Sequence, residues 1–211
     1  MNPSPQSSPL HERERRILSG SRANLTAVLL AGGESRRMGR DKATILFRGK
    51  PMWQVQLEVL RRLEPSEILV SATTDPRWRP ADVQFVADDP PSHGPLSGLA
   101  ASLAQMRSAY LLALAIDMPF MSENYLRYLY DQIEPGCGVV PKIGYRYEPL
   151  AAIYPGEACV DFRNALSCED FSLQTLVRRL IAAGKLREVR VKGQQKTLFL
   201  NVNEMADLQS A

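Results

Sequence analysis

The stretch TAVLLAGGESRRMGRDK, residues 26–42, sets the expectation for the fold. Thr26–Leu30 is an unbroken apolar run, typical of a strand that is buried on both faces of a parallel sheet. Two glycines follow it directly, where the backbone can turn tightly and approach a ligand closely. Four cations come next, and their charge suits a polyphosphate: Arg36, Arg37, Arg40 and Lys42. We therefore expect a phosphate-binding loop at the end of the first strand.

Strands and helices alternate through the next part of the chain. Helices are expected at 51–63, 95–106 and 123–132, the last with Ser122 as its N-cap, and strands at 68–70, 83–86 and 110–116. This alternation is typical of βαβ units and predicts an α/β fold with a doubly wound, mostly parallel sheet. In such sheets ligands bind at the carboxyl ends of the strands.

The C-terminal part has a looser pattern. We expect strands at 138–141, 150–154, 186–191 and 197–200, helices at 157–166 and 172–183, and a short helix from Asn203. No linker interrupts the chain, so residues 24–211 are expected to form a single domain. Residues 1–23 lack both an apolar periodicity and the apolar core of a secretory signal, and we expect them to be a disordered tail.

Composition narrows the choice of function class. The 211 residues carry a formal net charge of only +3, which argues against a general nucleic-acid binder. No apolar run approaches the ~20 residues of a membrane span. The three cysteines are widely spaced, as expected of reduced thiols in a cytoplasmic protein.

Two acidic positions stand at the ends of expected strands. Asp117 follows the apolar run at 110–116, where a lone carboxylate suits Mg²⁺ that also binds phosphate oxygens. The same aspartate could instead cap the next helix. Asp88 and Asp89 follow the strand at 83–86, and the sequence leaves open which of them faces a ligand.

The first loop matches neither the Walker A pattern nor the dinucleotide fingerprint. Its full string, L-A-G-G-x-S-x-R-M-G-x-D-K, is joined by HGPLSGL at 93–99, LAIDMPF at 114–120 and NVN at 201–203. In order and spacing, these motifs resemble the molybdenum cofactor guanylyltransferases, a family of the nucleoside-triphosphate transferase superfamily. The related cytidylyltransferases and sugar-nucleotide pyrophosphorylases end this loop in Pro-Lys, whereas this chain has Asp41-Lys42.

The resemblance implies a Rossmann-like nucleotidyltransferase fold and an enzyme that transfers GMP from Mg²⁺-bound GTP to molybdenum-loaded molybdopterin. It also implies molybdenum insertion proteins and acceptor molybdoenzymes as partners. In that family's pattern, Arg37 and Lys42 neutralise phosphates, and Asp117 holds the metal. The remaining implied contacts belong to the nucleotide or to the second substrate: Leu30, Ala31, Gly32, Gly33, Ser71 and Asp88 for the nucleotide, and Glu148, Asn201 and Asn203 for the second substrate.

The chain departs from the family at Ser71, where many members have an asparagine that contacts the nucleotide. This leaves open a transferase that uses CTP or another nucleoside triphosphate, and also a non-catalytic carrier of pterin or nucleotide. If guanine is the base, we expect an asparagine at position 71 to preserve or sharpen the preference.

Overall fold

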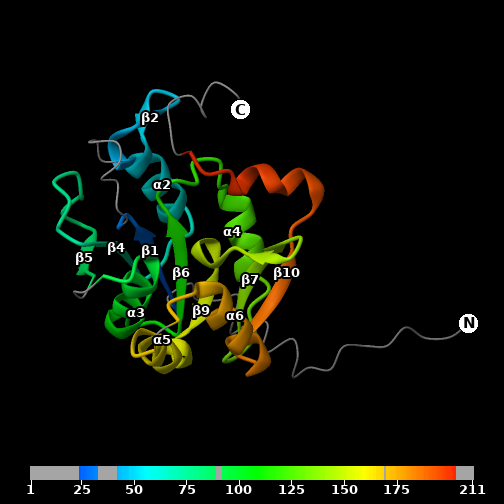
Figure 1. Ribbon diagram of the computed structural model, residues 1–211. Helices are drawn as coiled ribbons and strands as arrows, with labels where there is room; N and C mark the ends of the chain where they lie inside the picture. Colours follow the sequence, from blue (N-terminus) through cyan, green and yellow to red (C-terminus); the bar gives the residue numbers. More distant parts are fainter. Residues whose placement is uncertain (1–23, 33–41, 89–91, 169, 203–211) are drawn as a thin grey trace, which may run out of the picture.

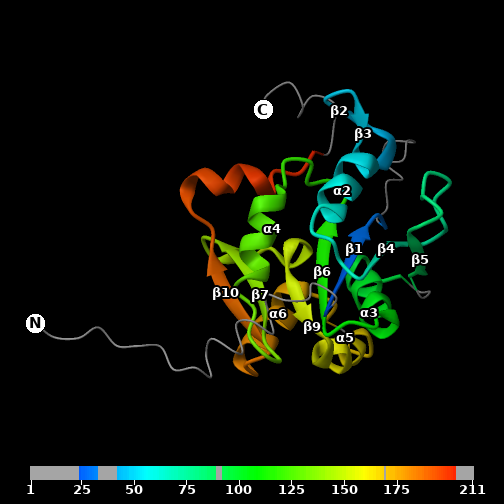
Figure 2. The ribbon, with the colours of Figure 1, turned by 180° about the vertical axis from the view of Figure 1, so that it is seen from behind.

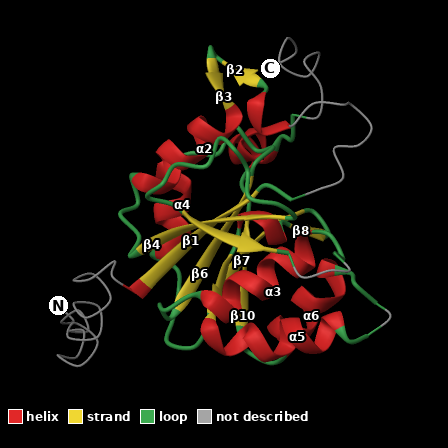
Figure 3. Ribbon diagram, turned by 90° about the vertical axis from the view of Figure 1, so that its left-hand side faces the viewer, coloured by secondary structure: helices red, strands yellow, loops and turns green. Residues whose placement is uncertain are grey.

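The computed structural model describes residues 24–32, 42–88, 92–168 and 170–202. In these ranges, one eight-stranded sheet has helices on both faces, as Figures 1 and 3 show. The strands are β1 (Leu25–Leu30), β2 (Leu46–Phe47), β3 (Lys50–Pro51), β4 (Glu67–Ala72), β5 (Gln84–Ala87), β6 (Tyr110–Ala115), β7 (Gly138–Ile143), β8 (Arg146–Tyr147), β9 (Ile153–Pro155) and β10 (Leu186–Arg190). The α-helices are α2 (Met52–Arg61), α3 (Pro95–Gln105), α4 (Glu123–Tyr130), α5 (Cys159–Leu166) and α6 (Leu173–Ala182). The 3-10 helices are η3 (Lys42–Thr44), η4 (Pro149–Ala151), η5 (Gly156–Ala158) and η6 (Gly193–Phe199).

The strand order in the large sheet is β10-β7-β9-β6-β1-β4-β5, and β8 pairs with β7. β1 runs parallel to both β4 and β6, β4 to β5, and β10 to β7, whereas β8 and β9 are antiparallel to their neighbours. The chain winds from β1 outward to β4 and β5, then returns to place β6 on the other side of β1. The predicted doubly wound, mostly parallel sheet is confirmed, and its switch point lies between β1 and β6.

The core has two layers, one on each face of the sheet. Along β1, Leu25, Ala27 and Leu29 belong to one apolar cluster, and the alternate residues Val28 and Leu30 belong to the other. Helices α2 and α4 supply side chains to the first layer, and α3, α5 and α6 supply the second. Figure 3 shows these helices on opposite sides of the sheet. The unbroken apolar runs of β1 and β6 are buried along their whole length because both faces are covered.

The expected helix starts follow from local chemistry. The Ser122 hydroxyl accepts a hydrogen bond from the Tyr125 backbone N–H at 3.3 Å, which confirms Ser122 as the N-cap of α4. Pro95 occupies the first turn of α3, where its missing N–H costs no helical hydrogen bond. These caps place the first turns of both helices close to the carboxyl edge of the sheet.

The strand expected at 197–200 is wrong, because the segment belongs to the 3-10 helix η6. Two local hydrogen bonds explain this. The Gln195 side chain accepts from the Lys192 backbone N–H at 3.0 Å, and the Thr197 hydroxyl donates to the Gln194 carbonyl at 3.1 Å. Such contacts satisfy the backbone within the segment, so it needs no neighbouring strand.

The strand expected at 150–154 is only half right. Pro149 lacks an N–H and has a fixed φ, and the chain turns through η4 before β9 begins at Ile153. No strand was expected between 141 and 150, where the structure has β8 paired with β7.

A second hairpin, β2–β3, was not expected either. It turns at Arg48 and Gly49, which both have positive φ, as a two-residue hairpin loop requires. Figure 2 shows this hairpin above α2, on the side of the molecule toward which β1 and β6 point.

Two further expectations, the tail at 1–23 and the helix from Asn203, lie outside the described residues. Within the described ranges, every helix is too short or too polar to cross a membrane.

Candidate active site

The carboxyl ends of β1 and β6 meet at the switch point of the sheet. Leu30 is paired with Ala115, and its carbonyl accepts a hydrogen bond from the Ile116 backbone N–H at 3.1 Å. The chain leaving β1 at Ala31 therefore lies beside the chain that leads from β6 into Asp117. Of the predicted loop, Gly33, Arg36, Arg37 and Arg40 lie outside the described residues.

The backbone after β1 stays tied to β4. The N–H groups of Ala31 and Gly32 both donate to the Ser71 carbonyl, at 2.8 and 3.1 Å. The pairing with β4 thus continues past the end of β1, and the Gly32 N–H, part of the expected phosphate-binding loop, donates within the protein. Gly32 has a different function in the structure: it gives space to a neighbouring side chain.

That side chain is Asp88, which follows β5 and is only 6% exposed. Its backbone N–H donates to the Ala72 carbonyl at 3.1 Å, and its carboxylate accepts a 2.6 Å hydrogen bond from the Ser71 hydroxyl. An ideal Cβ at Gly32 would lie 2.6 Å from Asp88 Oδ2, and one at Gly98 would lie 2.5 Å from Ser71 Oγ. The structure thus brings Gly32 of the first loop and Gly98 of the HGPLSGL motif close to the hydrogen-bonded side chains of Ser71 and Asp88.

Lys42 and Asp117 form the second part of the site. Asp117 Oδ2 is 3.9 Å from Lys42 Nζ, and the two side chains are 21% and 28% exposed. Lys42 begins η3, whose next residue, Ala43, is buried in the core with Leu57 of α2. Buried anchoring of this kind holds the lysine at the switch point.

Burial raises the pKa of Asp117, and the nearby charge of Lys42 offsets only part of that rise. The alternative that Asp117 caps the next helix is excluded, since Ser122 caps α4. Within the described ranges, no group of three His, Cys, Asp or Glu side chains is close enough to hold a metal ion. A single carboxylate at this edge still suits Mg²⁺, which commonly binds one or two carboxylates and the phosphates of a substrate.

The residues expected to bind a second substrate are only partly brought together. Asn201 is exposed, and the next residue, Val202, donates its N–H to the Asp117 carbonyl at 2.9 Å, so this segment lies against the loop that carries Asp117. Asn203 lies outside the described residues. Glu148 follows β8 and is tied to β7 by a 2.9 Å hydrogen bond from its N–H to the Pro141 carbonyl.

Glu148 lies within electrostatic reach of Tyr125 in α4. Burial raises the pKa of the Glu148 carboxyl, with Arg146 opposing. Burial raises the pKa of Tyr125 in α4, and the negative charge of Glu148 adds to this rise. Tyr125 also contacts Phe199 edge to face, with 5.3 Å between ring centroids, and sequence reasoning gave it no role.

His93 of the HGPLSGL motif lies in the loop before α3. Its ring stacks on Phe171 at 3.7 Å between centroids, and its backbone N–H donates to Ser97 Oγ at 2.9 Å. These contacts join the loop to the segment before α6, and they give the histidine a structural role.

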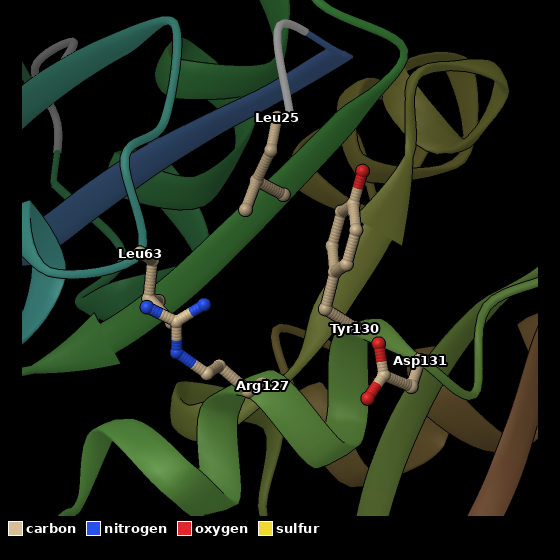
Figure 4. Close-up of a pocket in the computed structure, with 5 residues that line it drawn as sticks. All are labelled: Leu25, Leu63, Arg127, Tyr130 and Asp131. Carbon is tan, nitrogen blue, oxygen red and sulfur yellow. The ribbon is translucent and has the colours of Figure 1, made fainter. Parts of the chain in front are cut away.

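A cavity of about 80 Å³ lies at the opposite end of the sheet, near the start of β1 (Figure 4). It is lined by Leu25, Leu63, Arg127, Tyr130 and Asp131, and the Arg127 guanidinium is already bonded to Glu123 and to the Arg62 carbonyl. Ligand pockets usually enclose roughly 300–1,000 Å³. This cavity is therefore too small for a nucleotide and does not compete with the carboxyl edge as the active site.

The doubly wound sheet, with an aspartate and a lysine facing each other at its switch point, defines the class: an α/β protein whose ligand site is expected at the carboxyl ends of its central strands. A family model described as "MobA-like NTP transferase domain" matches residues 27–188. The chain belongs to this family and is an NTP transferase.

Named relatives agree with this placement. A protein of Opitutus terrae named "Probable molybdenum cofactor guanylyltransferase" is 33% identical over 193 residues, which cover 90% of this chain and 96% of that one. The solved structure of molybdopterin-guanine dinucleotide biosynthesis protein A from Archaeoglobus fulgidus aligns with a TM-score of 0.71 at 23% identity, over 88% of this chain and 95% of that one.

The fold is shared more widely. A 4-diphosphocytidyl-2C-methyl-D-erythritol synthase from Anaerococcus prevotii aligns with a TM-score of 0.68 at 14% identity, over 90% of this chain and 94% of that one. The fold alone therefore does not decide which base is used.

Proposed function

We propose that this protein transfers GMP from GTP to molybdenum-loaded molybdopterin, which yields molybdopterin guanine dinucleotide and pyrophosphate. The observation that carries the proposal is the Lys42–Asp117 pair at the switch point between β1 and β6. The 33% identity to a relative named for guanylyl transfer supports the choice of substrates. Molybdenum insertion proteins and acceptor molybdoenzymes would be its partners, in the cytoplasm.

Catalysis of this reaction requires mainly that the protein positions the two substrates and neutralises the charge of the phosphates. The attacking group is a terminal phosphate of the pterin substrate, which is already an anion, so no side chain has to act as the nucleophile. Lys42, with Arg37 from the loop, would neutralise the negative charge that builds up on the triphosphate as pyrophosphate leaves. Asp117 would hold Mg²⁺, which supplies further charge neutralisation at the phosphates.

The two ends of the site would bind the two substrates. Asp88 offers a carboxylate to the donors of a guanine base on the β4–β5 side. Glu148 and Asn201, with Asn203, would hold the pterin on the β6–β7 side, where carboxylate and amide groups match its donors and acceptors. In the strand order, β1, β6 and β9 lie between β4 and β7, and the Lys42–Asp117 pair lies at the carboxyl ends of β1 and β6.

Two alternatives differ from this proposal in a measurable way. A cytidylyl or other nucleotidyl transferase would release pyrophosphate with another nucleoside triphosphate. A carrier would bind without turnover. The test is pyrophosphate release from Mg²⁺-bound GTP, with and without molybdenum-loaded molybdopterin, for the wild type and the Asp117→Asn variant. We expect release only when both substrates are present, and release about 10²-fold slower in Asp117→Asn than in the wild type. Tight binding of both without pyrophosphate release would favour the carrier.

A further inference from the structure

The hydroxyl and the carbonyl of Ser71 both form hydrogen bonds within the protein. Its hydroxyl donates to Asp88 Oδ1 at 2.6 Å, and its carbonyl accepts from the N–H groups of Ala31 and Gly32. A serine hydroxyl has a single proton to donate, and here that proton is committed to a carboxylate. Ser71 is thus poorly placed to contact a base directly.

The Asp88 carboxylate is held on three sides. Ser71 bonds one oxygen, and the two glycines leave just enough space for the group: an ideal Cβ at Gly98 would lie 3.0 Å from Oδ1, and one at Gly32 would lie 2.6 Å from Oδ2. The backbone of Asp88 is fixed as well, through its hydrogen bond to Ala72. The direction in which the carboxylate points is therefore set by its neighbours.

We propose that Ser71 is a positioning residue that determines base preference through Asp88, by fixing the carboxylate in the orientation that accepts hydrogen bonds from a base with adjacent N–H donors. The inference rests on the proposed guanylyl transfer. Guanine presents its N1–H and N2–H₂ donors side by side, and cytosine lacks such a pair. A carboxylate that is free to rotate would lose much of that discrimination, since a well-oriented acceptor is what leaves the wrong base unpaired.

A double-mutant cycle tests whether Ser71 acts through Asp88. Kd values for GTP and CTP, each with Mg²⁺, are measured by calorimetry for the wild type, Ser71→Ala, Asp88→Asn and the double variant. We expect each single variant to lower the GTP preference by about 10-fold or more, as for loss of a hydrogen bond to a charged group. The double variant should be no worse than the poorer single variant, because both changes remove the same contact.

The matched control is Ser102→Ala. Ser102 is fully buried and donates a 2.7 Å hydrogen bond to the Gly98 carbonyl, so the change removes a similar group from a similar environment. We expect it to leave the GTP preference unchanged. Ser71→Cys, which keeps the shape but is a weak donor, should fall between the wild type and Ser71→Ala even if the alanine variant folds poorly.

Two results would overturn the inference. One is a GTP preference in Ser71→Ala that equals that of the wild type. The other is a double variant whose loss is the product of the two single losses, which would mean that Ser71 contacts the base independently. If the wild type prefers another base, the proposed function fails. The same cycle run on that base then still decides whether Ser71 acts through Asp88.

Discussion

Replacing Gly98 with alanine should damage the site although alanine favours helices. Gly98 lies in α3 without a positive φ, so the backbone accepts alanine, and the better helix propensity should return about 1 kcal/mol. The new Cβ would lie 2.5 Å from Ser71 Oγ, 3.0 Å from Asp88 Oδ1 and 3.3 Å from Leu30 Cδ2. Overpacking of this kind costs about 1–3 kcal/mol. The displaced Ser71–Asp88 hydrogen bond, which involves a charge, costs about 1.5–3 kcal/mol more.

We therefore expect Gly98→Ala to lower the free energy of unfolding by about 1.5–5 kcal/mol, taken together from these three effects. Urea denaturation measures this loss, and calorimetry with GTP should show weaker binding. Gly193→Ala is the matched control, since a Cβ there meets nothing within 4 Å and its φ is not positive. A Gly98→Ala variant that is as stable as the wild type and binds GTP normally would refute the close packing on which this reasoning depends.

Three further predictions concern single side chains. Asp117→Asn should lower turnover by ~10²-fold, as for other major electrostatic groups. Because burial raises the pKa of Asp117 in the folded state, the folded protein loses stability as the pH rises from the ordinary value of 3.8 through the raised value. The ligand-free Asn variant should hence be more stable than the wild type at pH 7 but not at pH 3, and equal denaturation midpoints at both would contradict this. Lys42→Ala should weaken GTP much more than guanosine in calorimetry, whereas equal losses would indicate a lysine that is only structural. Gln56 is fully buried in α2, and neither polar atom of its side-chain amide has a hydrogen-bond partner among the described residues. Gln56→Met removes these unpaired groups and should therefore raise the urea midpoint of unfolding. A lower midpoint would reveal a partner for the amide.

The sequence was sufficient where one physical rule governs a whole segment. The apolar runs at β1 and β6 are buried on both faces. A short, unbroken apolar run is typical of a strand in a parallel sheet that is covered on both sides, so these two strands could be predicted. Ser122 was recognisable as a cap because its hydroxyl chemistry is local. Asp117 was placed correctly at the sheet edge because the end of an apolar run marks the end of a buried strand.

Features that depend on contacts between distant segments could not be predicted in this way. The Gly32 N–H is taken by Ser71, a residue 39 positions away, and no local pattern indicates that pairing. The 3-10 helix η6 arises from side chains that satisfy the nearby backbone, which overrides the strand propensity of its apolar residues.

Ser71 was read as a shorter substitute for a nucleotide-contacting asparagine, whereas its hydroxyl bonds Asp88. This geometry favours the opposite of the prediction that Ser71→Asn preserves or sharpens a guanine preference. The larger amide would have to fit where Ser71 Oγ is already 2.6 Å from Asp88 and 2.5 Å from the ideal Cβ position of Gly98. We now expect Ser71→Asn to displace Asp88 and weaken the preference.

The choice of base is the most direct test of guanylyl transfer. Equal concentrations of GTP, CTP and ATP are offered together with Mg²⁺ and molybdenum-loaded molybdopterin, and the dinucleotide products are identified by mass. We predict the guanine dinucleotide as the main product, with kcat/KM for GTP at least ~10-fold above that for CTP or ATP, which corresponds to about 1.4 kcal/mol of differential transition-state binding. A mixture dominated by the cytosine dinucleotide would contradict guanylyl transfer.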